Sequence, residues 1–269
     1  MSPVIELWSY RSLIANLAQR ELKSKYKRSA LGWLWSLLNP GLTLIIYTIV
    51  FGSFIRIPPP VGGNGELNSF ALYLFAALVS WNFFNAVVVG SMSALVGAGP
   101  LLKKVYFPAA CPPIANALTA LNQAAIETAI LVVVMVAVGN ASFVFLAYPL
   151  VLTLLFAFSL GLGLVLSVGN VYLRDVGYIV GIGLQALFYA TPIIYTLDFV
   201  PEMLGPLPVG EIVRWNPLTQ FVEASRSIFY ALEFPDAATW LYLVVVSAAS
   251  LGFGWMIFER ISRDVVEEL

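Results

Sequence analysis

Residues 70–96 read FALYLFAALVSWNFFNAVVVGSMSALV, and no charged side chain interrupts them. A hydrocarbon core of about 30 Å is crossed by about 20 helical residues, because an α-helix rises about 1.5 Å per residue. The stretch exceeds that length, and it lacks the alternation over about ten residues that marks a strand of a membrane barrel. It therefore predicts a transmembrane helix in an all-α membrane protein.

Further apolar runs of similar length recur along the chain. Of its 269 residues, 60% are hydrophobic and 11% are charged, whereas soluble domains carry about 25% charged residues. We expect a single membrane domain over residues 1–269. Its six expected transmembrane helices are approximately Leu34–Phe54, Phe70–Val96, Ile114–Val138, Phe145–Gly169, Val176–Tyr195 and Trp240–Phe258.

The 14 Lys and Arg residues divide unequally between the two sides of these spans. Three of them, Arg56, Arg214 and Arg226, fall on one side. The others fall on the opposite side: Arg11, Arg20, Lys23, Lys25, Lys27, Arg28, Lys103, Lys104, Arg174, Arg260 and Arg263. Because cytoplasmic loops are enriched in Lys and Arg, we expect a multi-pass protein of the cytoplasmic membrane with both termini in the cytoplasm.

The residue inventory argues against catalysis by this chain. It has no His and one Cys, Cys111, which excludes the usual Cys/His zinc site and a Ser–His–Asp triad. No G-x-x-x-x-G-K-[ST] motif is present, so the chain is not itself a P-loop ATPase. A membrane transferase or hydrolase would need grouped acid–base residues near one membrane face, and on the outer side only Asp198, Glu202 and Glu211 cluster. We therefore expect no catalytic residue, metal site or cofactor in this chain.

The segment 5–29 has the pattern of an amphipathic helix at the cytoplasmic surface. Its apolar residues recur at helical spacing, and Arg and Lys occupy much of the remaining surface. Binding to anionic lipid is a sufficient explanation of these charges. A second interpretation makes the helix a wall of a cytoplasmic entrance, with Lys27, Arg28, Trp33 and Trp35 beside it. The two Trp side chains also suit anchoring at the membrane interface.

Two other segments lie between the spans. Segment 97–113 begins with helix-breaking Gly and Pro residues and then presents Lys103, Lys104, Tyr106, Phe107 and Pro108. It fits either a docking surface for a soluble partner or an ordinary basic loop with interfacial aromatic residues. Segment 196–239 reads as two short helices separated at Pro217, with Glu223 and Arg226 spaced to pair. It is either a folded external loop or a re-entrant hairpin, which requires packing on protein or water.

Three motifs, in this order, resemble one known family. They are Tyr26-Lys27-Arg28-Ser29 followed by Leu31-Gly32-x-Leu34-Trp35 and Asn39-Pro40; then Leu101-Leu102-Lys103-Lys104-Val105-Tyr106-Phe107-Pro108; then Asn216-Pro217-Leu218-Thr219 with Glu223 and Arg226. They are similar to the start, the coupling-helix region and the external re-entrant segment of ABC-2 type permeases that export bacterial polysaccharides. By pattern, the relatives are exporters of O-antigen, teichoic acid and other lipid-linked glycans.

The resemblance implies a homodimer that binds two copies of a separate ATP-binding subunit, which holds ATP and Mg²⁺. The exported substrate would be a lipid-diphosphate-linked polysaccharide. Lys103–Pro108 would transmit the ATPase motion, and segment 5–29 would border the lipid entrance. An external gate would include Trp215, Asn216, Pro217, Glu223 and Arg226. The alternatives are an ABC-2 exporter of a drug or small lipid and a structural scaffold.

Aromatic and polar side chains inside the spans are candidates for the path of the substrate. Flat aromatic rings suit a sliding sugar chain, although such rings more often face lipid or pack in a core. The aromatic candidates are Tyr47, Phe51, Trp81, Phe84, Phe188 and Tyr189. Asn116, Gln123 and Glu127 form a polar line on the third span, where Asn82 and Asn85 could be neighbours. An ionised Glu in hydrocarbon costs about 2.5–3.5 kcal/mol or more, so we expect Glu127 to face protein, a water-filled path or the outer surface.

Overall fold

The computed structural model describes residues 3–27, 29, 31–55 and 60–262, and these residues contain helices and no β-strand. Five helical stretches within them are long and apolar enough to cross a membrane: Gly32–Phe51, Phe70–Gly97, Cys111–Ala137, Phe143–Tyr172 and Ala237–Ile261. The expected all-α, multi-pass architecture is confirmed.

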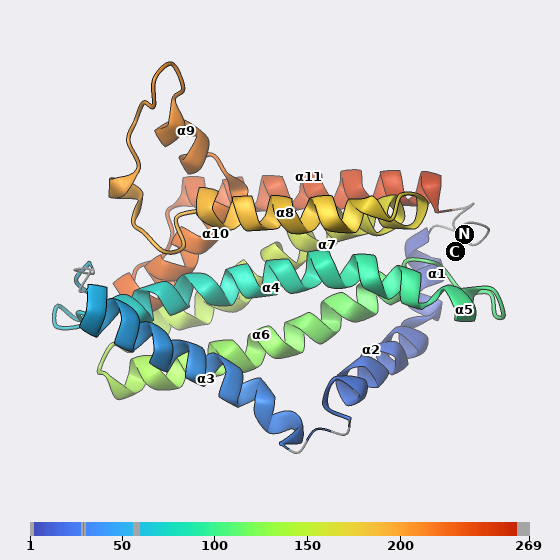
Figure 1. The fold of residues 1–269 in the computed structure, drawn as a ribbon, viewed down its shortest axis with the longest axis horizontal. Coiled ribbons are helices and arrows are strands. Elements are labelled where there is room, and N and C mark those ends of the chain that lie inside the picture. The colour runs from blue at the N-terminus through green and yellow to red at the C-terminus, as the bar shows by residue number, and fades with distance from the viewer. Residues whose placement is uncertain (1–2, 28, 30, 56–59, 263–269) are drawn as a thin grey trace.

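Helix α4 (Phe70–Gly97) lies at the centre of the bundle. Helices α6 (Cys111–Ala137) and α7 (Tyr148–Tyr172) pack against α4, and α11 (Ala237–Ile261) packs against α7 (Figure 1). Most side chains of α4 are buried within the protein itself. A helix that is apolar on all sides, as α4 is, can be accommodated in this way without facing water.

Two glycines bring α7 and α11 into backbone contact. A Cβ atom added at Gly254 of α11 would collide with the carbonyl oxygen of Gly161 on α7. Small residues permit such close approach between membrane helices. Gly181 of α8 (Asp175–Ala190) is different, because a Cβ atom added there would meet open space among the described residues.

Helix α8 is shorter than the fifth expected span. The sequence is apolar from Val176 to Tyr195, but the helix has 16 residues and ends at Ala190. Thr191 takes the extended conformation, with φ −101° and ψ 134°, as is favoured before a proline such as Pro192. At about 1.5 Å per residue α8 measures about 24 Å, which is below the thickness of a hydrocarbon core. Six spans are therefore not established by helix length.

The expected amphipathic helix over 5–29 is two helices. Helix α1 covers Pro3–Ser9 and α2 covers Arg11–Tyr26, and Tyr10 between them has φ −95° and ψ 12°. Helix α2 ends at Tyr26, because Lys27 is extended, with φ −65° and ψ 131°. Arg28 lies outside the described residues. Ile14, Leu17 and Ala18 are buried on the face of α2 that packs on α6.

The remaining elements gather at the two ends of the bundle. Figure 1 places α1, α5 and the C-terminal end of α11 at one end, and α9 and α10 at the other. Segment 97–113 and the N-terminal helices were expected on the same side of the spans, and they lie at the same end of the bundle. The other elements are 3₁₀ turns Gly32–Leu34, Phe143–Ala147 and Leu197–Phe199, helices α3 (Trp35–Tyr47), α5 (Gly99–Leu102), α9 (Val209–Arg214) and α10 (Pro217–Arg226), and π-helices Thr48–Ile55 and Ser227–Ala231.

Candidate functional site

Segment 97–113 exposes one of its two aromatic residues and buries the other. The one-turn helix α5 is followed by a bend that leaves Lys103 and Lys104 exposed. Tyr106 is 79% exposed, whereas Phe107 is 4% exposed and belongs to the core. The two aromatic side chains, predicted to act together, thus have different surroundings: Tyr106 can contact a partner directly, and Phe107 supports the segment from beneath.

The N-terminal helix α1 contacts this segment. The Tyr106 hydroxyl donates a hydrogen bond of 3.2 Å to Oε1 of Glu6. The negative charge of Glu6 raises the pKa of Tyr106 above its usual value. Glu6 was not predicted, because a contact between residues one hundred positions apart has no local signal in the sequence.

A cavity of about 580 Å³ lies between α1, segment 97–113 and the C-terminal end of α11. Lys103 and Lys104 contribute positive charge to its lining, while Glu6 and Glu259 contribute negative charge. Trp255 and Phe258 of α11 supply aromatic surface. The cavity thus offers both charge signs and apolar area to a protein partner, the mixture that is typical of protein–protein interfaces.

The expected entrance residues lie near α2 and α3. Lys27 is exposed, Trp33 is 67% exposed and Trp35 is 45% exposed. Arg28 lies outside the described residues. Helix α2 is held to α6 beside them, where the Thr119 hydroxyl lies 3.4 Å from a carboxylate oxygen of Glu21. Burial raises the pKa of Glu21.

The six aromatic candidates for a substrate path fall in two groups. In the first, Tyr47 and Phe51 have ring centroids 5.8 Å apart, and Phe51 lies 5.1 Å from Phe70 of α4. This row of rings continues through Phe70 to Tyr73 at 6.0 Å. It therefore joins the end of α3 and the following π-helix to the centre of the bundle.

The second group lies between α4 and α8. The ring of Trp81 lies 5.3 Å from Phe188, and Phe188 lies 5.4 Å from Tyr189. These three residues line a hollow of about 310 Å³ together with Asn85 and other residues. Phe84 lies behind Trp81, at 5.8 Å between ring centroids; it is 2% exposed and stacks on Phe158 of α7.

The polar line on α6 divides between two environments. The Asn116 side-chain amide lies 3.4 Å from the carbonyl oxygens of Ala86 and Val87 on α4. Farther along α6, Glu127 is 7% exposed. Its carboxylate accepts hydrogen bonds from Asn82 of α4 at 3.1 Å and from Gln123 at 3.2 Å. Asn82 is thus the neighbour expected from the sequence, whereas Asn85 lines the hollow beside Trp81.

Segment 196–239 contains the expected pair of short helices. Asn216 caps α10 by accepting a hydrogen bond of 3.1 Å from the backbone N–H of Leu218. Its side-chain amide also donates to Thr191 at 3.1 Å, which ties the start of α10 to the end of α8. Pro217 occupies the first helical position, where its missing N–H is not needed. Trp215 is 65% exposed and donates to Glu211 at 3.0 Å.

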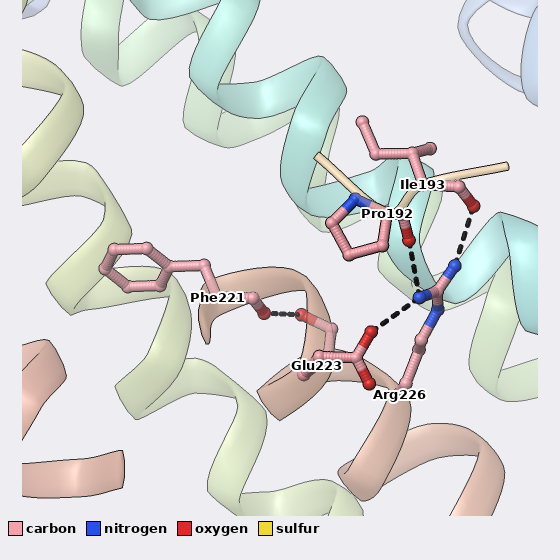
Figure 2. A network of polar contacts seen from close by, with 6 residues as sticks. Pro192, Ile193, Phe221, Glu223 and Arg226 are labelled. Atoms are coloured by element: carbon pink, nitrogen blue, oxygen red, sulfur yellow. Dashed lines mark hydrogen bonds and ion pairs between the residues drawn. The ribbon is translucent and has the colours of Figure 1, made fainter. Parts of the chain in front are cut away.

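Arg226 forms the most heavily bonded contact of this segment (Figure 2). It pairs with Glu223 at 2.6 Å, as the spacing predicted. Its guanidinium also donates to the carbonyl oxygens of Pro192 and Ile193, both at 2.6 Å. The guanidinium carbon lies 3.9 Å from the centre of the Tyr73 ring. Arg226 thereby joins α10 to α4 and to the chain that follows α8.

Helix α10 is packed into the bundle along one face. Phe221, Ser225 and the following Ile228 are fully buried. The Ser225 hydroxyl lies 2.7 Å from the Ser80 hydroxyl of α4, and Ser80 lies 3.3 Å from the Tyr148 hydroxyl of α7. Helix α10 is therefore continuous with the core of the protein, whereas Phe199, Met203 and Trp215 of the same segment are 57–71% exposed.

Comparisons with known proteins identify the family to which this chain belongs. The family model for ABC-2 type transporters matches residues 12–230. An O-antigen export system permease protein of Myxococcus xanthus is 31% identical over 99% of this chain and 98% of that protein. A protein of the same description from Klebsiella pneumoniae is 27% identical, with 81% and 80% covered. The polysialic acid transport protein KpsM of Escherichia coli is 25% identical, with 89% of each covered. The chain belongs to the ABC-2 type transporter family of membrane proteins.

Proposed function

We propose that this chain is the transmembrane subunit of an ABC exporter that moves a lipid-diphosphate-linked polysaccharide across the cytoplasmic membrane. The observation that carries the proposal is the alignment of 99% of the chain with an O-antigen export permease. The polysialic acid transport protein adds a second polysaccharide among the relatives. An exporter of a drug or small lipid has no such support.

A separate ATP-binding subunit drives transport, as membership of the ABC-2 family implies. It binds ATP and Mg²⁺, and two copies serve one exporter. The surface of this chain on which that subunit docks includes Lys103, Lys104, Tyr106 and Pro108, and the buried Phe107 supports it from beneath. The exposed Tyr106 and the adjoining cavity of about 580 Å³ support this assignment.

Two copies of this chain form the complete permease. Helix α3 and helix α8 support the proposal, because they bury few side chains within one copy: Ser36 and Pro40 in α3, and Leu184 in α8. Gly181 lies on α8 with open space around it among the described residues. Close packing against a second copy would use such a small residue.

In the membrane we propose six crossings, with α8 and the chain after it completing the fifth. Both termini then lie in the cytoplasm, in agreement with the distribution of Lys and Arg. Segment 196–239 enters the membrane region from outside as a re-entrant hairpin. The buried face of α10 supports it, since non-helical backbone at that depth must be covered by protein.

The substrate path combines an entrance at the cytoplasmic side with a gate outside. Lys27, Trp33 and Trp35 border the entrance beside α2, and the aromatic rows at Tyr47 and Trp81 flank the path. The external gate is built on Trp215, Asn216, Pro217, Glu223 and Arg226. The Arg226 contacts support this role, because they join α10 to the chain that follows α8. Opening of the gate would either break these contacts or move the two segments together.

The proposal is tested in two strains. In one the gene is deleted, and in the other Tyr47 and Phe51 are replaced with Leu, which keeps apolar volume and removes both flat aromatic faces. Loss of the chain should reduce surface polysaccharide and cause its lipid-linked precursor to accumulate in the cytoplasmic leaflet. The double variant should show the same change to a smaller degree. Unchanged surface polysaccharide and unchanged precursor after deletion would contradict the proposal.

A further inference from the structure

A buried carboxylate lies at the base of a polar groove in the membrane-spanning bundle. Glu127 of α6 is 7% exposed and accepts hydrogen bonds from Asn82 and Gln123. A carboxylate has about four lone-pair positions, so these two bonds leave it able to accept others. Gln123 also lies 3.3 Å from the carbonyl oxygen of Ser36, which ties α3 to the same cluster.

The groove beside Glu127 has a volume of about 490 Å³ and lies between α2, α3, α4 and α6. This volume is within the range of about 300–1,000 Å³ that small-molecule sites occupy. Its lining is mostly polar: Lys25, Ser36, Asn39, Thr43, Asn82, Gln123 and Glu127, with the aromatic residues Trp35 and Tyr47 and the apolar residues Leu78 and Ala86. Trp35 and Tyr47 stand 12 residues apart on α3, a rise of about 18 Å.

The lining discriminates between classes of ligand. Asn82 and Gln123 already donate to Glu127, and a lipid chain would cover the remaining acceptor positions of the carboxylate without offering a hydrogen bond, which is unfavourable. A diphosphate would be repelled by Glu127, with only Lys25 to attract it in this groove. A metal ion finds no group of three His, Cys, Asp or Glu side chains in the described residues. A neutral, polyhydroxylated ligand is the class that fits.

We propose that this groove binds sugar hydroxyl groups of the exported saccharide, with Glu127 as the principal acceptor. Hydroxyl donors form strong hydrogen bonds to an ionised carboxylate. Amides at Asn39 and Asn82 offer further donors and acceptors, and Trp35 and Tyr47 offer flat apolar faces for sugar rings. This inference rests on the proposed function and adds a hydrogen-bonding subsite to the aromatic path described above.

The test compares two synthetic lipids: a polyprenyl diphosphate carrying a disaccharide and the same polyprenyl diphosphate without sugar. Their dissociation constants for the complex of this chain with its ATP-binding subunit are measured by native mass spectrometry. Glu127→Gln retains the shape but removes the charge and replaces one acceptor oxygen with an NH₂ donor, so the glycosylated lipid should bind about tenfold more weakly. Binding of the lipid without sugar should be unchanged.

A matched pair on exposed helix surfaces separates recognition from folding. The hydroxyls of Thr43 and Thr153 each donate to the carbonyl four residues earlier in their own helix, both at 2.8 Å. Thr43 lines the groove, whereas Thr153 lies on α7 outside its lining. Thr43→Val should weaken binding of the glycosylated lipid about two- to tenfold, and Thr153→Val should not.

The other possible outcomes of these binding measurements would each overturn a proposal. Equal weakening of both lipids by Glu127→Gln, or no weakening of either, would overturn the sugar site while leaving the proposed function in place. The same holds if Thr43→Val and Thr153→Val behave alike. If the wild-type complex binds neither lipid, the proposed function fails, and the sugar site fails with it.

Discussion

Replacing Arg226 with Lys should destabilise the protein even though the charge is kept. Arg226 is 3% exposed, and its guanidinium reaches the carbonyl oxygens of Pro192 and Ile193 simultaneously. A guanidinium presents several donors in a fixed planar fork, whereas an ammonium is a compact point charge. An ammonium at this position can keep the Glu223 carboxylate and one carbonyl, and the other carbonyl then loses its partner.

The size of the effect follows from these contacts. A hydrogen bond from a charged donor contributes about 1.5–3 kcal/mol. Losing one of the two carbonyl contacts should therefore lower the free energy of unfolding by about 1.5–3 kcal/mol in Arg226→Lys. Arg226→Met, which removes every polar contact and leaves Glu223 without its partner, should cost about 3–5 kcal/mol.

The measurement is reversible unfolding by SDS in mixed micelles, with Arg214→Lys as the control. Arg214 is exposed on α9 in the same segment 196–239, so its replacement should change the free energy of unfolding by less than about 0.5 kcal/mol. Equal effects of Arg226→Lys and Arg214→Lys would show that the two carbonyl contacts of Arg226 do not stabilise the protein. So would an Arg226→Met variant as stable as the wild type.

Two further contrasts follow from burial. Tyr106→Ala should weaken co-purification of the ATP-binding subunit and leave stability unchanged, whereas Phe107→Ala should lower the free energy of unfolding by about 3 kcal/mol. Pull-down yield measures the first effect and SDS unfolding the second. If Phe107→Ala instead weakened co-purification and Tyr106→Ala lowered stability, Phe107 would be the docking residue. In a Cys111→Ser background, Ser225→Cys should resist an impermeant thiol reagent at rest and react during ATP turnover, because Ser225 is fully buried. Ser227→Cys should react more readily at rest, and rapid labelling of both positions in every state would contradict the packed external segment.

The apolar runs predicted the helical architecture because membrane helices satisfy their own backbone hydrogen bonds. Composition and length therefore decide most of the fold. Where a helix is shorter than predicted, a local feature ends it. Thr191 and Pro192 end α8 although the chain stays apolar to Tyr195, and the break at Tyr10 divides the N-terminal helix.

The candidate site was predictable where its contacts are local. The spacing of Glu223 and Arg226 was enough to expect their pair. The carbonyl partners of Arg226 come from a segment more than thirty residues away, and sequence periodicity carries no information about such contacts. Likewise nothing local distinguishes Tyr106 from Phe107, since which neighbour turns inward depends on how the bend packs against the core.

The most direct test is reconstitution of this chain with its ATP-binding subunit in proteoliposomes that contain a lipid-diphosphate-linked polysaccharide. Glycan that crosses the bilayer becomes protected from, or exposed to, a glycosidase on one side only. Our account predicts glycan crossing that requires ATP hydrolysis and both subunits, and that falls when Tyr106 is replaced by Ala. ATP hydrolysis by the intact complex without any movement of the glycan would contradict it.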